Sequence, residues 1–188
     1  RFLRDNPIAI KLNLFQYKIS NEERLSLHLK DHQPAWMGIP FGLVNAKVFT
    51  EDKVYFDEDM FMYFDDVEWC YRLKKLGYVH FFTTKSTVKH YNGGSMGNHF
   101  SGWRYGQIII SDWLGVLKIY GRLYFLFCML IQFTTIILDN FFYFVNKKRR
   151  NQNIKKLLDM DKEMFVKYFP KILFSYSQKT SGAKKFLK

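Results

Sequence analysis

Residues 54–78 carry the sequence VYFDEDMFMYFDDVEWCYRLKKLGY, and this stretch decides how the chain is expected to fold. Its second half predicts a helix over 66–76, because apolar residues recur on one face while Glu68 and Arg72 have the spacing of an i, i+4 ion pair. Acidic side chains near the first turn interact favourably with the helix dipole. The stretch therefore predicts a rigid helix that begins at two adjacent carboxylates.

Both ends of this helix carry recognisable signals. Asp65 is expected to be the N-cap residue, and Asp66 is expected to lie in the first turn. Gly77 follows the last apolar position of the helix, where glycine commonly adopts the left-handed conformation that ends a helix. The sequence thus fixes both boundaries of the element that would hold the acidic pair.

Shorter elements are predicted on either side. Alternating or continuous apolar residues predict strands near 43–49 and 78–82, and a short extended piece at 87–90. A capping-box spacing begins at Ser20 and favours a helix that ends near residue 28 or 30, although the alternating leucines there would also suit a strand. Helices mixed with such strands indicate an α/β fold class.

Residues 123–145 form an apolar stretch that is followed directly by the basic run 147–150. A helix needs about 20 apolar residues to span a bilayer. Gln132 and Asp139 make spanning costly, so three interpretations stay open: a spanning helix, a helix lying at the membrane interface, or a helix packed in the domain or in a homodimer. The basic run favours contact with an anionic membrane surface.

The composition narrows the classes of partner. The chain has 188 residues and a formal net charge of +12, which favours an anionic partner. No helix-turn-helix, RNP-like or zinc-finger pattern accompanies the charge, so nucleic-acid binding is not predicted. Cys70 and Cys128 lie far apart, without the spacing of a disulfide framework or a zinc site, and both are interpreted as small buried side chains.

The ordered pattern from 34 to 95 resembles the second half of the catalytic domain in family 2 glycosyltransferases of the GT-A fold. The nearest subgroup contains rhamnosyltransferase-like and galactofuranosyltransferase-like enzymes. The pattern has an aromatic-Asp-Glu element at 56–58, the acidic pair with a further acid and an arginine, a glycine before a predicted strand, and the sequence HYNGGS at 90–95. Single pieces of this pattern are weak signals, but the ordered set is specific.

The resemblance implies a division of the chain. Residues 1–120 would be the C-terminal, acceptor-side part of an α/β, Rossmann-like GT-A catalytic domain. Residues 121–188 would be a helical, apolar-then-basic region that associates with the membrane or mediates oligomerisation. The implied activity is transfer of a sugar, with inversion, from a nucleotide-sugar donor to a saccharide or glycolipid acceptor. It would serve cell-surface polysaccharide synthesis at the cytoplasmic face of the cell membrane.

Such a reaction needs a carboxylate to take the proton of the attacking acceptor hydroxyl. By resemblance, Asp66 matches the position of this general base, and Asp65 would support it. Without the surrounding pattern, Asp65 would be interpreted only as an N-cap and Asp66 only as an acid favoured by the helix dipole. The residues that correspond to the acceptor side are Trp36, Gly38, Asp57 and Glu58.

Two further positions are implied on the donor side. His90 matches a position that in some relatives completes a site for Mn²⁺ or Mg²⁺, although a histidine near a loop is as often a surface residue. Backbone N–H groups of Gly93, Gly94 and Ser95 could face the donor phosphates, or these residues could form a simple turn.

The segment 1–33 is too short for a nucleotide-binding unit, and no metal-binding Asp-x-Asp is found in it. The expectation is therefore a chain whose donor site comes from a missing N-terminal half or a partner subunit, and which by itself does not transfer sugar. The alternative hypothesis is a non-catalytic remnant that acts as a membrane-surface or subunit-assembly module.

Overall fold

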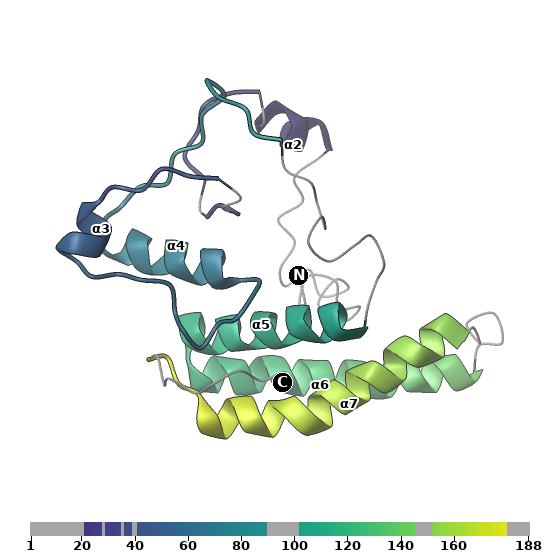
Figure 1. Ribbon diagram of the computed structural model, residues 1–188. Coiled ribbons are helices and arrows are strands. Elements are labelled where there is room, and N and C mark those ends of the chain that lie inside the picture. Colours follow the sequence, from purple (N-terminus) through teal and green to yellow (C-terminus); the bar gives the residue numbers. More distant parts are fainter. Residues whose placement is uncertain are drawn as a thin grey trace.

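The computed structural model describes residues 21–27, 29–34, 36–38, 41–89, 102–145 and 152–179. The elements in these ranges are the helices α2 (Asn21–Leu27), α3 (Lys47–Thr50), α4 (Asp65–Lys75), α5 (Gly102–Tyr120), α6 (Arg122–Val145) and α7 (Gln152–Ser175). Figure 1 shows that α5, α6 and α7 form the larger part, with α4 lying above α5 and α2 further away.

The expected α/β, Rossmann-like fold is wrong for the part of the chain that the structure describes, which is helical and contains no strand. Segment 78–82 makes one isolated antiparallel bridge, between His32 and Phe82. Segment 43–49 instead enters helix α3, where Val48 donates to the carbonyl of Asn45 at 3.0 Å. An alternating sequence becomes a strand only beside a partner strand, and here local hydrogen bonds satisfy the backbone instead.

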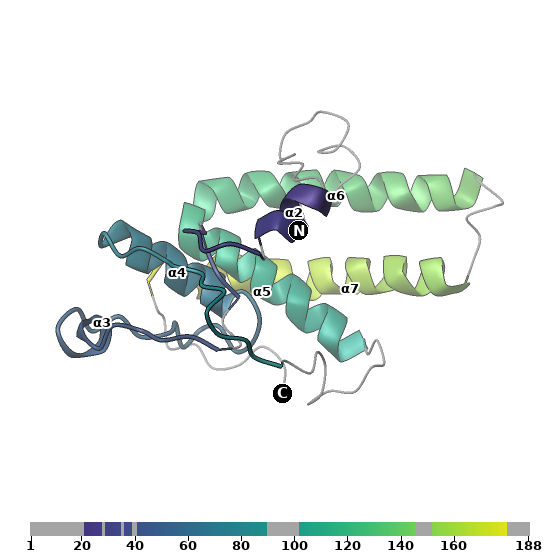
Figure 2. The same cartoon turned by 90° about the horizontal axis from the view of Figure 1, so that it is seen from above.

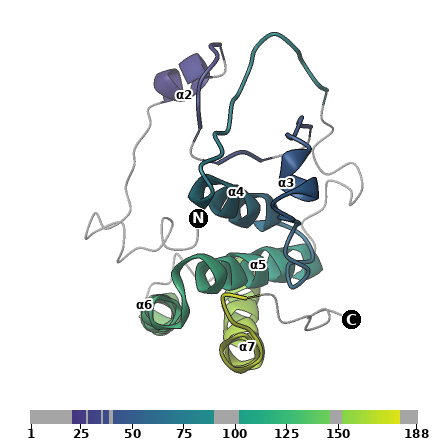
Figure 3. The same ribbon diagram turned by 90° about the vertical axis from the view of Figure 1, so that its left-hand side faces the viewer.

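The three long helices pack in two layers. Seen end-on, α6 and α7 lie side by side, α5 lies against both, and α4 covers the opposite side of α5 (Figure 3). The view from above shows that α6 and α7 run next to each other along their length (Figure 2). The shared core contains Met60, Ile110, Trp113, Leu114, Leu117, Phe125, Cys128, Met129, Met164, Tyr168, Ile172 and Tyr176.

A tight turn at Gly121 joins α5 to α6. Its φ of 85° lies in the left-handed region, which glycine adopts without the steric cost of a Cβ. The Gly121 N–H donates to the carbonyl of Leu117 at 2.9 Å, and Phe125 donates to the carbonyl of Gly121 at 3.0 Å. This geometry lets α6 fold back along α5 with a single residue between them.

The predicted helix over 66–76 is confirmed as α4, within one residue at each end. Gly77 has a φ of 88°, and the N–H groups of Gly77 and Tyr78 donate to the carbonyls of Lys74 and Leu73, each at 3.1 Å. These bonds form a Schellman motif, as the glycine predicted. The N-terminal prediction is wrong: the cap is left-handed Phe64, without a side-chain hydrogen bond, and Asp65 is already the first helical residue.

Candidate functional site around the acidic pair

Trp69 fixes α4 to the segment before it. Its indole Nε1 donates to the carbonyl of Val54 at 3.1 Å, and its ring stacks on Phe56 with 4.6 Å between centroids. Val48 and Leu73 complete this small core, which is separate from the core of the long helices. The buried Trp69 side chain therefore holds the helix that carries the acidic pair against the preceding segment.

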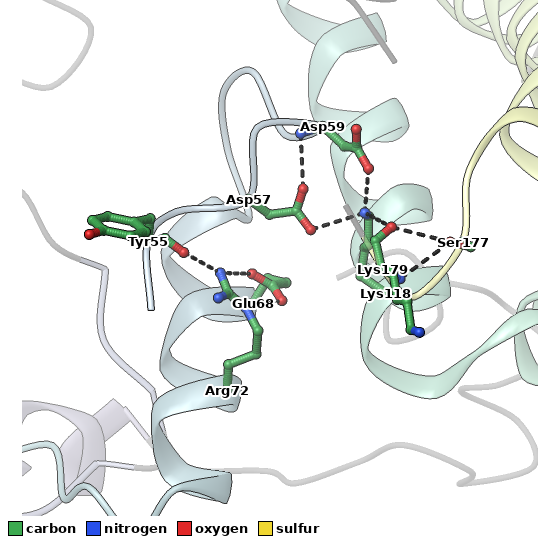
Figure 4. Close-up of polar contacts among 8 residues, drawn as sticks. All are labelled: Tyr55, Asp57, Asp59, Glu68, Arg72, Lys118, Ser177 and Lys179. Atoms are coloured by element: carbon green, nitrogen blue, oxygen red, sulfur yellow. Dashed lines mark hydrogen bonds and ion pairs between the residues drawn. The ribbon is translucent and has the colours of Figure 1, made fainter. Parts of the chain in front are cut away.

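Glu68 and Arg72 fix the same helix from its side, and their predicted i, i+4 ion pair is confirmed. Two Arg72 nitrogens donate to the buried Glu68 carboxylate at 2.7 and 2.9 Å, and Arg72 also donates to the carbonyl of Tyr55 at 2.7 Å (Figure 4). Two parallel N–H···O bonds give such a pair a defined geometry. This acid and this arginine of the family-like pattern thus connect α4 to the preceding loop.

A stripe of polar and small residues on α5 receives the loop that leads into α4. We call Gln107, Ser111, Gly115 and Lys118 the α5 stripe; their spacing places them on one face of the helix. Ser111 donates to the carbonyl of Met62 and accepts from Gln107 at 3.1 Å. Ser111, Gly115 and Lys118 each contact a different part of the loop 57–64.

Gly115 makes room for the ring of Phe64. A Cβ at Gly115 would overlap the Phe64 ring atoms, so only glycine allows the helix and the ring to come this close. Phe64 and its neighbour Tyr63 both have positive φ, at 61° and 65°. Such values are uncommon for aromatic residues, and contacts with α5 hold the chain in this turn immediately before Asp65.

Lys118 is the buried cation of the site. Its Nζ lies 2.9 Å from the Asp57 carboxylate, contacts the Asp59 carboxylate directly, and donates to the carbonyl of Lys179 at 2.9 Å (Figure 4). Asp57 also accepts from the backbone N–H of Asp59 at 2.9 Å. Because all three charged side chains are buried, the cation is required to neutralise the acids.

Asp65 and Asp66 lie half-buried at the start of α4. One oxygen of Asp66 accepts from the Val67 N–H at 2.8 Å, and a Cβ placed on Gly38 would lie 3.5 Å from the other oxygen. The thiol of Cys70, one turn further along α4, lies 3.9 Å from the carbonyl of Met37. The segment 36–38 therefore runs beside the acidic end of α4.

The predicted site residues fall into three groups. Asp66 and Gly38 are brought together, with Trp36 on the same segment and 56% exposed. Asp57 lies in the buried ion cluster with Lys118, whereas Glu58 is exposed at the surface of the loop. Four predicted residues lie outside the described part of the chain: His90, Gly93, Gly94 and Ser95.

The metal site implied by the resemblance stays a prediction, because its candidate ligand His90 lies outside the described residues. Within the described ranges, no group of three or more His, Cys, Asp or Glu side chains is placed to hold an ion. Asp57 and Asp59 share the ammonium of Lys118.

Cys70 lies one turn along α4 from Asp66. Burial raises the pKa of its thiol, and the negative charge of Asp66 raises it further, despite the opposing hydrogen bond with the Met37 carbonyl. The thiol therefore stays protonated at neutral pH, and a nucleophilic role is disfavoured because the thiolate is the reactive form. A carboxylate is the better candidate for chemistry here.

Lys118 was not among the residues predicted from sequence, although a signal for it exists. It is a lone charge between Leu117 and Ile119 in a helix whose other residues are mostly apolar, and it continues the spacing of Ser111 and Gly115. A charged residue at a core position predicts a buried partner of opposite sign. What the pattern cannot supply is the identity of the partner, which lies about 60 residues away.

Comparison of the chain with protein-family models, with curated proteins and with solved structures found no match.

Proposed function

We propose that this chain is the acceptor-side part of a nucleotide-sugar glycosyltransferase in which Asp66 is the general base. The observation that carries the proposal is the contact between two separate parts of the family-like pattern: the Gly38 segment lies against a carboxylate oxygen of Asp66. An acceptor hydroxyl held by residues 36–38 would lie within reach of that oxygen. The proposal rests on this local arrangement and requires no β-sheet.

In the proposed step, the acceptor oxygen attacks the anomeric carbon of the donor sugar. A new C–O bond forms, the bond from that carbon to the diphosphate breaks, and the nucleoside diphosphate leaves with the bonding electrons. The acceptor proton passes to the Asp66 carboxylate, which is the task of a general base. Asp65 assists by position, as the neighbouring acid at the same end of α4.

Rigid support of α4 is the second reason for choosing Asp66. Trp69 and the Glu68–Arg72 pair hold the helix from two directions, and Phe64 locks the turn before it against α5. A general base must be held within hydrogen-bond distance of its target, and side chains on supported helices are positioned better than those on loops.

The test replaces Asp66 by Asn in the gene of the host that makes the protein. Extracts of wild-type, variant and deletion cells are given a panel of labelled nucleotide sugars, and labelled polysaccharide and glycolipid are measured. Asp66→Asn is expected to lower the transfer that is missing from deletion cells by about 100- to 10,000-fold, the usual contribution of a general base. Melting temperature should fall by a few degrees at most, because Asn keeps the shape of the side chain and the loss of one first-turn charge costs about 0.3–1 kcal/mol.

Glu51→Gln is the matched control, because Glu51 is an exposed acid whose ion pair with Lys47 is also exposed. It should transfer at the wild-type rate. Near-normal transfer by Asp66→Asn would show that the base assignment is wrong. If deletion cells transfer every sugar as wild-type cells do, the chain is instead a non-catalytic module, the alternative hypothesis.

A further inference from the structure

We propose that α6 lies in the plane of an anionic membrane surface, with its exposed apolar face in the lipid, and does not cross the bilayer. This inference goes beyond the transfer reaction and does not depend on it. By length and composition alone, α6 is the one helix in the described part of the chain that could span a membrane. The packing of α6 in the structure favours a helix in the membrane interface over a helix that spans the bilayer.

One face of α6 is exposed and has no other described helix packed on it. Its buried residues, which include Phe125, Cys128 and Ile136, face the core, and 22% of its most apolar window is buried. The most exposed apolar side chains of α6 form a stripe at helical spacing, which we call the α6 stripe: Leu123, Leu126, Phe127, Leu130, Ile137, Phe141 and Phe144. No charged side chain belongs to this stripe. Contiguous apolar surface of this kind marks a protein or membrane contact.

The neighbour of α6 argues against spanning. The helices α6 and α7 are paired antiparallel from end to end: Arg122 donates to the carbonyl of Tyr176 at 3.1 Å, and Phe133 lies 5.5 Å from Phe165 between ring centroids. At the other end, Tyr143 and Leu158 line one cavity. Figures 1 and 2 show this side-by-side course.

Charged residues occur along the whole of α7, and those exposed to solvent are Lys155, Lys156, Asp159, Lys162, Glu163, Lys167 and Lys171. If α6 crossed the bilayer, its partner α7 would enter with it. These side chains would then lie in hydrocarbon, where exposed charges are costly and rare. With α6 in the plane of the interface, the same side chains stay in water or among the headgroups.

The positive charge near α6 favours an anionic membrane as the partner of the α6 stripe. The basic run 147–150 begins two residues after α6 ends, and the neighbouring helix α7 carries five lysines. Apolar and aromatic residues combined with flanking cations are the features of helices that bind anionic membrane surfaces. A second copy of this chain would bring the same positive charge to the contact, since the net charge is +12, and like charges oppose association.

The first experiment measures binding of the full chain to vesicles of phosphatidylglycerol mixed with phosphatidylcholine, and to vesicles of phosphatidylcholine alone. Binding is expected to the anionic vesicles and to weaken as salt is raised. The double variant Leu130→Gln/Ile137→Gln should bind about tenfold less tightly or worse, because each change removes apolar area from the lipid contact. No binding of the wild-type chain to anionic vesicles at low salt would overturn the proposal.

A matched control uses apolar residues that are at least as exposed and belong to segments outside the three long helices. Leu130 and Ile137 are 62% and 52% exposed, and Leu43 and Val79 are 97% and 64% exposed. Leu43→Gln/Val79→Gln should bind vesicles like the wild-type chain. Equal losses in the two double variants would show that general hydrophobicity, and not the α6 stripe, causes binding, which would contradict the proposal.

The second experiment measures depth. Spin labels are attached to single cysteines introduced at Leu123, Leu130, Ile137 and Phe144. The native thiols of Cys70 and Cys128 are fully buried, so they should not react with the label. A helix lying in the interface predicts similar shallow depths, about 5–10 Å, at all four positions. A spanning helix predicts a maximum near Leu130 and Ile137 with both ends near the surfaces, and that pattern would refute the in-plane arrangement.

Sedimentation of the chain without lipid tests the competing occupant. The chain is expected to be monomeric over the concentrations used for vesicle binding. A dimer that Leu130→Gln/Ile137→Gln dissociates, while Leu43→Gln/Val79→Gln does not, would assign the α6 stripe to a second copy of this chain and overturn the membrane proposal.

Discussion

The loop that precedes α4 and the helix α6 are opposites in their use of side chains. The loop buries two carboxylates, Asp57 and Asp59, against the ammonium of Lys118 on α5, whereas α6 leaves leucine and phenylalanine side chains exposed. Each arrangement is unfavourable when considered alone. The first is balanced within the molecule, and the second is proposed to be balanced by lipid.

This difference predicts where single substitutions act. A buried ion cluster is stable only with all of its members, so losing one of them should affect the folded state itself. Leu130 and Ile137 of the α6 stripe are more than half exposed, so changes there should leave stability nearly unaffected and show their effect only when the membrane is present. The following substitutions test the internal half of this comparison.

Lys118→Met should produce the largest effect, because it leaves two carboxylates buried without their cation. Loss of one member of a buried ion pair costs about 3–5 kcal/mol, and we expect a decrease of that size in the free energy of unfolding, measured with urea. Lys156→Met, at an exposed lysine of α7, should change it by less than about 0.5 kcal/mol.

A rescue experiment separates loss of charge balance from loss of packing. Adding Asp57→Asn and Asp59→Asn to Lys118→Met removes both uncompensated charges while keeping the shapes of the side chains. Much of the lost stability should return. A triple variant as unstable as Lys118→Met would mean that the lysine stabilises α5 by packing, and the charge comparison with α6 would fail.

Gly115→Ala should produce the next largest effect. Alanine usually stabilises a helix relative to glycine, by about 0.5–1 kcal/mol, but here its methyl group would overlap the Phe64 ring. We expect a net loss of about 1–3 kcal/mol, typical of overpacking, in the same urea experiment. A gain in stability would contradict the close contact between α5 and the loop.

Two variants serve as controls for Gly115→Ala. Gly106→Ala, on the same helix, meets only the flexible end of Met164 at 3.3 Å and should cost little. Combining Gly115→Ala with Phe64→Leu should recover part of the lost stability, because leucine lacks the ring atoms that the alanine methyl group would overlap. Both results would assign the effect to this one contact.

Asp161→Asn should change stability least. It tests the cost of a carboxylate on α7 that is partly buried against Tyr105 of α5. Burial raises the pKa of Asp161, the hydrogen bond from Tyr105 (2.7 Å) lowers it, and the charge of Asp139 raises it again. The folded-state pKa is thus above the unfolded value, so folding favours the protonated form. Stability from this group is present at low pH and lost as the pH rises through the folded pKa.

The asparagine variant should therefore melt slightly higher than the wild-type chain at pH 7, by under about 4 °C, which corresponds to about 1 kcal/mol or less in a chain of this size. The gap should close as the pH falls toward the ordinary aspartate pKa of 3.8. A gap that widens in acid would mean that the carboxylate is stabilised, not penalised, at this position.

The sequence predicted α4 well because its signals are local. The spacing of Glu68 and Arg72 and the glycine at position 77 all act within a few residues, and the structure contains the bonds that they imply. The prediction of strands at 43–49 and 78–82 was wrong because its signals were not local. A strand depends on a distant partner, which alternation of apolar residues does not identify, and α3 and an isolated bridge formed instead.

The candidate site was predictable to the same extent. Asp65 and Asp66 were expected at the start of a helix, and they are there. Asp57 was predicted on the acceptor side, but the structure buries it against Lys118, a partner that no local pattern could reveal. The contact between Gly38 and Asp66 joins residues from separate segments, so spacing alone could not have located it.

The separation of Lys118 from its acids also affects the order of events during synthesis. Asp59 precedes Lys118 by 59 residues, and ribosomes add about 5–20 residues per second. The two carboxylates therefore leave the ribosome about 3–12 s before the ammonium that pairs with them. Until Lys118 has been made, this ion cluster cannot form, and exposed carboxylates are solvated by water. Translation speed therefore sets the earliest time at which the loop can close on α5.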